Sequence, residues 1–113
     1  MSSRVRFFKK IMDAKSANNA VSDELSPADL VSVNELTYYI VFGAGTNAGA
    51  VQPESAHVAA YVGTWAAEGS PVAWSAADKV HKVSITGASF VARCRISTGV
   101  TGGTVDVWAL GLD

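Results

Sequence analysis

From about residue 30 onward the sequence alternates between apolar and other residues with a period of two, and this rhythm constrains the fold more than any other feature. Successive side chains of a β-strand point to opposite faces, whereas an amphipathic helix needs apolar residues every three or four positions. The clearest run is residues 90–98, in which Phe90, Ala92, Cys94 and Ile96 share one face. The pattern predicts an all-β chain.

Turn residues divide this region at intervals of roughly ten residues, as in sandwiches and related folds. Thr86-Gly87 and Gly102-Gly103 are such turns, and the glycine-rich residues 43–50 are expected to form a loop. We therefore predict an antiparallel β-sandwich or jelly roll of about six to eight short strands. The expected strands are residues 30–33, 36–42, 55–65, 79–85, 90–98 and 104–110.

The last two expected strands are interpreted as a hairpin. A symmetric hairpin would place Cys94 opposite Val107 in the core. On the other face it would pair Arg95 with Asp106 and Arg93 with Trp108. These contacts would set the register of the two strands.

The N-terminal residues have a different character. Residues 1–15 hold five basic side chains and one acidic one, while the rest of the chain holds four basic and nine acidic ones. Phe8, Ile11 and Met12 have the i, i+3, i+4 spacing of a helix face. Residues 1–29 are therefore expected to be a basic arm, extended or a short helix, with a linker, and residues 30–113 the sandwich domain.

A basic arm with an apolar stripe is suited to binding an acidic surface, a nucleic acid or a second copy of the acidic body. The acidic body argues against nucleic acid. We expect the apolar side chains to anchor the arm on a protein partner and the cations to meet acidic groups there. The expected partner-binding residues are Arg4, Arg6, Phe7, Phe8, Lys9, Lys10, Ile11 and Met12.

Catalytic and metal-binding patterns are not evident in the sequence. Its two histidines, His57 and His81, are far apart, and the single Cys94 fits a buried apolar position. The glycine-rich loop lacks the lysine of a phosphate loop. We expect neither an enzyme nor a bound cofactor or metal, and a carboxylate pair could arise only from the tertiary fold, among Glu54, Glu68 and Asp78.

The three tryptophans, Trp65, Trp74 and Trp108, have two interpretations. They could form an exposed platform for sugars or bases. Alternatively, at least two of them fill the core or anchor loops over its ends, which is the interpretation we favour.

Residues 58–110 resemble the small β-sandwich structural proteins of tailed bacteriophages. The resemblance rests on a Val/Ala-rich strand, the EGSPVAW loop at 68–74, the strand with Val83 and Ile85, the alternating run 90–97 and the closing GGTVDVW at 102–108. Such domains are similar to capsid decoration, or cement, proteins, in which a jelly roll sits on the shell and an N-terminal segment reaches a neighbour. The resemblance implies this division into arm and sandwich and carries no catalytic residue.

The expected function is therefore that of a viral structural protein, a decoration subunit that stabilises the head shell. Its partner would be the major capsid protein or another virion protein, and the chain itself a homo-oligomer, a dimer or a trimer. It would be found in the virion, and in the host cytoplasm during assembly, with no membrane span. The alternatives are a phage tail or fibre module, or a carbohydrate-binding sandwich that uses Trp65 and Trp74.

Overall fold

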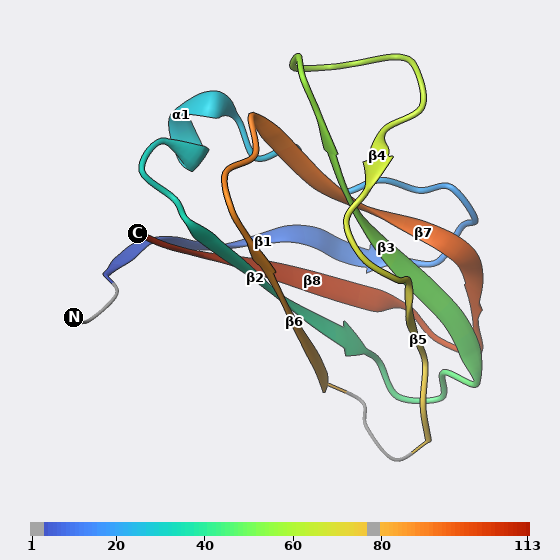
Figure 1. Ribbon diagram of the computed structural model, residues 1–113. Helices are drawn as coiled ribbons and strands as arrows, with labels where there is room; N and C mark the ends of the chain where they lie inside the picture. The colour runs from blue at the N-terminus through green and yellow to red at the C-terminus, as the bar shows by residue number, and fades with distance from the viewer. Residues whose placement is uncertain (1–3, 77–79) are drawn as a thin grey trace.

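The computed structural model describes residues 4–76 and 80–113 as an antiparallel β-sandwich, which confirms the predicted fold class (Figure 1). Sheet A has the strand order β1-β8-β2-β6, formed by Val5–Lys15, Val105–Leu112, Glu35–Phe42 and Val80–Thr86. Sheet B is built on β3, which pairs with β7 and with two short strands, β4 and β5. These are Ala48–Ala56, Val91–Thr101, Ala66–Ala67 and Val72–Ala73. A single helical turn, α1, spans Pro27–Leu30.

The core lies between the two sheets and is made by alternate residues of each strand. Val105 and Val107 of β8 are fully buried, and they face the equally buried Cys94 and Ile96 of β7. Burying an aliphatic side chain of this size contributes about 1.5–3 kcal/mol. The predicted facing is therefore correct from Ala92 to Ile96 and along β8, but wrong at the start of β7, where Phe90 is 55% exposed and Val91 is fully buried.

The predicted hairpin is wrong, because β7 and β8 lie in different sheets. β7 pairs with β3, and β8 pairs with β1 and β2. The chain crosses between the sheets at Gly102, whose α-carbon packs so closely on Gly45 of the 43–47 turn that a side chain on either would strike the other's carbonyl. Both glycines have positive φ angles. The turn that the sequence predicts is present here, but it leads into the other sheet and not back along β7.

Two other expected strands differ from the structure. The strand expected at residues 30–33 is not observed: Leu30 ends α1, whose N-terminus is closed by a capping box between Ser26 and Asp29, and residues 31–33 form a turn. The strand expected at residues 55–65 lies earlier, as β3, and residues 57–65 form a loop. β3 is rich in Ala and Gly and contains Pro53, so its propensity is weak, and pairing on both of its edges overrides it. The strand expected at 79–85 is β6, and Lys79 lies outside the described residues.

The N-terminal residues are an extended strand of sheet A, so of the two expected conformations the helical one is wrong, and the segment is not a free arm. β1 pairs along β8 from Val5 opposite Leu112 to Lys15 opposite Val105. The register shifts between Lys10 and Met12, and this bulge turns Ile11 and Met12 to the same side. They are 3% and 1% exposed. The helix-like spacing of apolar residues is thus produced by a bulged strand.

Residues 16–25 are also part of the sandwich and not a linker. They run along the free edge of β7, where Ser22 N–H donates to the Cys94 carbonyl at 2.8 Å and Leu25 and Ala92 exchange backbone hydrogen bonds. The Ser22 hydroxyl accepts from the Cys94 N–H at 2.9 Å. The expected boundary at residue 29 therefore does not separate an arm from a domain.

Because Met12 fills the core, its truncation should destabilise the whole fold. We expect Met12→Ala to lower the free energy of unfolding by about 2–5 kcal/mol, measured by urea denaturation. Val5→Ala, on the same strand but mostly exposed, should change it by less than about 0.5 kcal/mol. Equal stability of the Met12→Ala variant and the unchanged chain would contradict the integration of β1.

Candidate functional site

The structure divides the predicted partner-binding residues between the two faces of β1. Phe7, Ile11 and Met12 belong to the core or pack against it, so they cannot anchor a partner as expected. The Phe7 ring lies over the α-carbon of Gly111, where a side chain would collide with it. Phe8 points the other way and is 57% exposed.

The cations of residues 4–15 are largely neutralised within the chain. Four of them form ion pairs with carboxylates of the same chain: Arg4 and Arg6 with Asp113, Lys9 with Asp29, and Lys10 with Asp13 and Asp106. These pairs are solvent-exposed and contribute little to stability. They nevertheless leave the strand less basic toward a partner than the sequence indicates.

The outer face of sheet A, directed away from sheet B, is unusually apolar. The registers place Phe8, Leu110 and Thr37 in one row, and Lys10, Trp108, Tyr39 and Lys82 in the next. An outer sheet face normally carries polar residues. Here the side chains are Phe8 and Lys10 of β1, Asp106, Trp108, Leu110 and Leu112 of β8, Glu35, Thr37, Tyr39 and Val41 of β2, and Val80, Lys82, Ser84 and Thr86 of β6.

Contacts between aromatic and basic side chains order the centre of this face. The Phe8 and Tyr39 rings meet edge to face with centroids 6.4 Å apart. The Lys10 ammonium lies 4.9 Å from the centre of the Trp108 ring. Lys10, and not Arg93, is therefore the cation on Trp108. The face presents a preformed aromatic and aliphatic surface.

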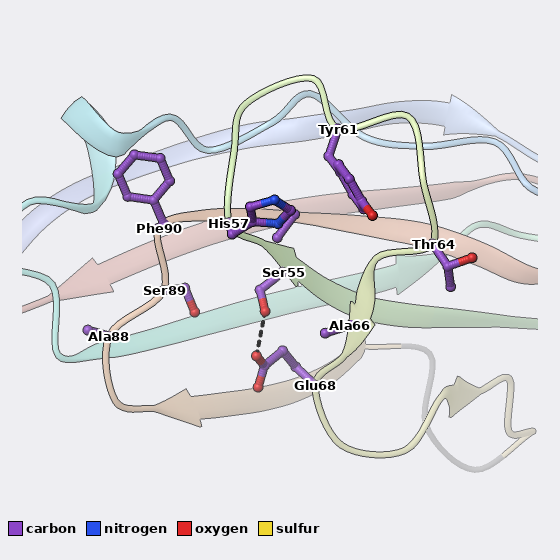
Figure 2. A pocket seen from close by; sticks show the side chains of 10 residues that line it. Ser55, His57, Tyr61, Thr64, Ala66, Glu68, Ala88, Ser89 and Phe90 are labelled. Carbon is purple, nitrogen blue, oxygen red and sulfur yellow. Dashed lines mark hydrogen bonds between the residues drawn. The ribbon is translucent and has the colours of Figure 1, made fainter.

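A pocket of about 380 Å³ lies elsewhere, at the end of sheet B. It is open to solvent and bordered by the end of β3, the loop 57–65, β4 and residues 88–90 (Figure 2). Its aromatic side chains are His57, Tyr61 and Phe90, and the His57 and Tyr61 rings meet with centroids 4.9 Å apart. Ser55, Glu68 and Ser89 supply polar groups, and the Ser55 hydroxyl donates to a Glu68 carboxylate oxygen at 2.7 Å.

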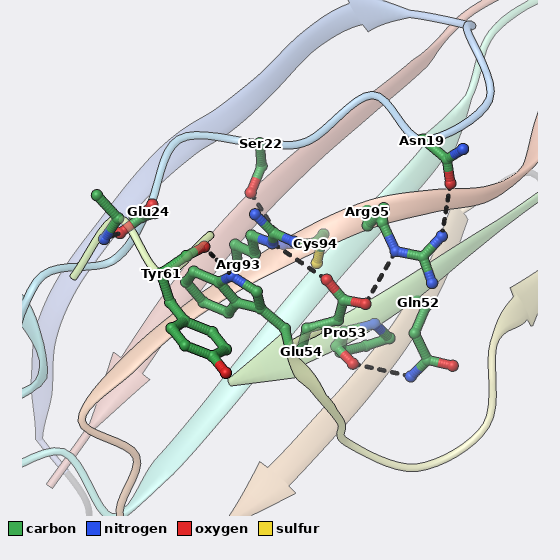
Figure 3. A network of polar contacts seen from close by, with 12 residues as sticks. Asn19, Ser22, Glu24, Gln52, Pro53, Glu54, Tyr61, Arg93, Cys94 and Arg95 are labelled. Atoms are coloured by element: carbon green, nitrogen blue, oxygen red, sulfur yellow. Dashed lines mark hydrogen bonds and ion pairs between the residues drawn. The ribbon is translucent and has the colours of Figure 1, made fainter. Parts of the chain in front are cut away.

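Glu54, the residue before the pocket-lining Ser55, is a buried carboxylate between two arginines (Figure 3). Glu54 of β3 is 4% exposed and accepts from Arg93 Nε at 3.1 Å and from Arg95 Nε at 2.9 Å. Register dictates this grouping, because Glu54 stands opposite Arg93 and next to the pair of Gln52 and Arg95. The two arginines satisfy both carboxylate oxygens.

This network fixes the loop 57–65 above it. Trp65, 4% exposed, lies under the Arg93 guanidinium, whose central carbon is 4.0 Å from the ring centre. The Trp65 indole N–H donates to the Tyr61 carbonyl at 2.9 Å. The Glu24 carboxylate accepts from the Ala60 N–H at 2.8 Å. The loop is therefore held at Tyr61 by the buried Trp65 and at Ala60 by Glu24.

The tryptophans follow the favoured interpretation for the most part. Trp65 anchors a loop and Trp74 packs against the core, so they do not form an exposed sugar platform. Trp108 is the exception, because it is half-buried on the outer face of sheet A.

Cys94 and the histidines are separated in the structure. Burial, with a smaller effect of the Glu54 carboxylate, raises the pKa of the Cys94 thiol far above its usual range. The His81 ring lies against Phe42. Among residues 4–76 and 80–113, no cluster of three or more His, Cys, Asp and Glu side chains is arranged to hold a metal ion. The expected carboxylate candidate Asp78 falls outside these residues.

Sequence reasoning missed the roles of Glu54 and of the loop 57–65. The strand alternation did mark Arg93 and Arg95 as neighbours on one face, and such a pair needs a carboxylate partner when it is buried. Selecting Glu54 required knowing that β3, and not β8, lies beside β7. Local sequence patterns do not specify a pairing of strands so far apart.

Comparisons with protein-family models, with curated proteins and with solved structures find no match to this chain. Within the described part of the chain, no helix has the length and apolar character required to cross a bilayer.

Removing the Glu54 charge should leave two arginines facing each other without their shared partner. We expect Glu54→Gln to lower the free energy of unfolding by about 2–3 kcal/mol in urea denaturation, less than for a fully buried pair because both guanidinium groups reach solvent. Glu35→Gln is the matched control, since Glu35 has no ion pair within the described residues, and it should change stability by less than about 0.5 kcal/mol. A Glu54→Gln variant as stable as this control would show that the network is dispensable.

Proposed function

We propose that this protein is a structural subunit of a virus particle, a decoration protein that binds the assembled head shell and stabilises it. The observation that carries the proposal is the apolar outer face of sheet A. A β-sandwich already has its core between the sheets, so a second apolar surface is suited to a protein partner. The resemblance to capsid decoration proteins indicates the shell as that partner.

The composition of the face fits protein docking. Aromatic side chains are enriched at protein interfaces, and charged groups are depleted at their centres. Tyr39 and Trp108 stand at the centre, flanked by Lys10 and Lys82 in the same row. Lys82 has no ion pair within the described residues. An acidic side chain of the shell protein would therefore complement it.

The proposed docking surface is the outer face of sheet A and not the expected N-terminal arm. Of the residues expected to bind a partner, Phe8 and Lys10 lie on the outer face of sheet A. A face built on four paired strands offers more rigid contact than a tail that must order on binding, so less conformational entropy is lost on docking.

Binding to shells tests the proposal. The purified chain is sedimented with head shells assembled from the coat protein encoded by the same genome, and we expect it to co-sediment. Phe8→Asp and Val80→Asp each place a charge on the outer face at an exposed position and should weaken binding by about tenfold or more. Val62→Asp, the same change at a fully exposed valine of the loop 57–65, should bind normally.

Three results would count against the proposal. A folded chain that stays in the supernatant would refute shell binding, and sedimentation with isolated tails instead would identify a tail module. If the chain forms dimers or trimers that either Asp variant dissociates, while shells bind both variants normally, the face joins copies of this chain.

A further inference from the structure

The pocket at the end of sheet B is separate from the docking face and has a chemistry of its own. Its lining places aromatic rings and hydroxyl groups side by side (Figure 2). Phe90 lies at the rim of the pocket and is 55% exposed. A volume of about 380 Å³ is in the range of small-molecule sites.

The wall formed by the loop 57–65 is held in place before any ligand arrives. Trp65 fixes the Tyr61 carbonyl, and the Tyr61 phenol lies where a side chain on residue 63 would be, which is possible because that residue is Gly63. Glu24 fixes the Ala60 N–H. A preformed pocket loses less entropy on binding than one that must assemble. The loop is thus built to hold Tyr61 and His57 over the pocket.

The charges and hydroxyls of the lining restrict the class of ligand. The Glu68 carboxylate disfavours an anion. A lysine or arginine side chain has donors only, so it would leave the donor capacity of Ser89 and His57 unused. Neither of these side chains has a hydrogen bond to the described part of the protein. A purely apolar ligand would strip water from these groups without replacing it.

A neutral polyol with one apolar face meets all these conditions. Its hydroxyl groups both donate and accept, which suits Glu68 as acceptor and Ser89 as donor or acceptor. Its C–H face can lie on an aromatic ring such as that of Phe90. We propose that this pocket binds a saccharide, with Phe90 and Tyr61 as the apolar walls and Glu68 and Ser89 as the hydrogen-bonding groups.

The proposal is independent of shell docking and replaces the tryptophan platform with a different set of residues. Binding is measured by titrating the ¹⁵N-labelled protein with cellobiose, lactose and N,N′-diacetylchitobiose and following amide shifts by NMR. We expect at least one of these to bind with a dissociation constant on the order of 1 mM. The shifts should centre on His57, Tyr61, Ser89 and Phe90.

Two variants assign the binding to the pocket. Phe90→Ala removes an exposed wall and Glu68→Gln removes the charge while keeping an acceptor for the Ser55 hydroxyl, so neither threatens the fold. Each should weaken binding by about fivefold or more. Val62→Ala, on the same loop but outside the lining, and Phe8→Asp, on the docking face, should bind as the unchanged chain does.

Several results would overturn this inference. One is the absence of shifts in the pocket with all three sugars at about 50 mM, far above the expected dissociation constant. Larger shifts of the same amides with arginine methyl ester or inorganic phosphate would assign the pocket to a charged ligand. Unchanged affinity of both Phe90→Ala and Glu68→Gln would place the sugar elsewhere.

Discussion

The fold depends on the N-terminal quarter of the chain, which pairs along β8 in sheet A and along the outer edge of β7 in sheet B. β1 satisfies the backbone groups of β8 in sheet A, and residues 16–25 then cross to sheet B and do the same for β7. An open strand edge is a site of aggregation, because its unpaired amides and carbonyls can recruit other strands. A segment that pairs with both sheets also holds them together around Ile11, Met12 and Leu25.

The sequence predicted those features that depend on local periodicity. The class of fold, the inward positions of β7 and β8 and the turns at residues 87 and 102 follow from alternation and glycine placement. Strand pairing does not, because Arg93 can meet Trp108 or Glu54 with the same local pattern. The helical alternative for the N-terminal residues is wrong for a related reason. A bulge at Lys10–Met12 changes which face the following side chains occupy, and spacing alone cannot distinguish such a bulge from a helical turn.

The outer face of sheet A and the pocket differ in how far the sequence could predict them. The outer face of sheet A follows from β2 and β8, which are apolar at nearly every position, as expected of strands covered on both faces. The pocket follows from no such pattern. It exists because Glu54 gathers Arg93 and Arg95, Arg93 covers Trp65, and Trp65 in turn fixes Tyr61. Each link joins residues that are brought together only by the tertiary fold.

The contact between β1 and the end of β8 has a practical consequence for topology. Arg4 and Asp113 are joined by two hydrogen bonds, one between their backbones at 3.0 Å and one from the Arg4 N–H to the Asp113 carboxylate at 2.8 Å. The start of β1 and the end of β8 accordingly lie at the same side of the molecule (Figure 1). A short peptide joining them would close the chain into a ring with little strain, and fresh termini could be opened at the solvent-exposed Val62 while every strand keeps its neighbours.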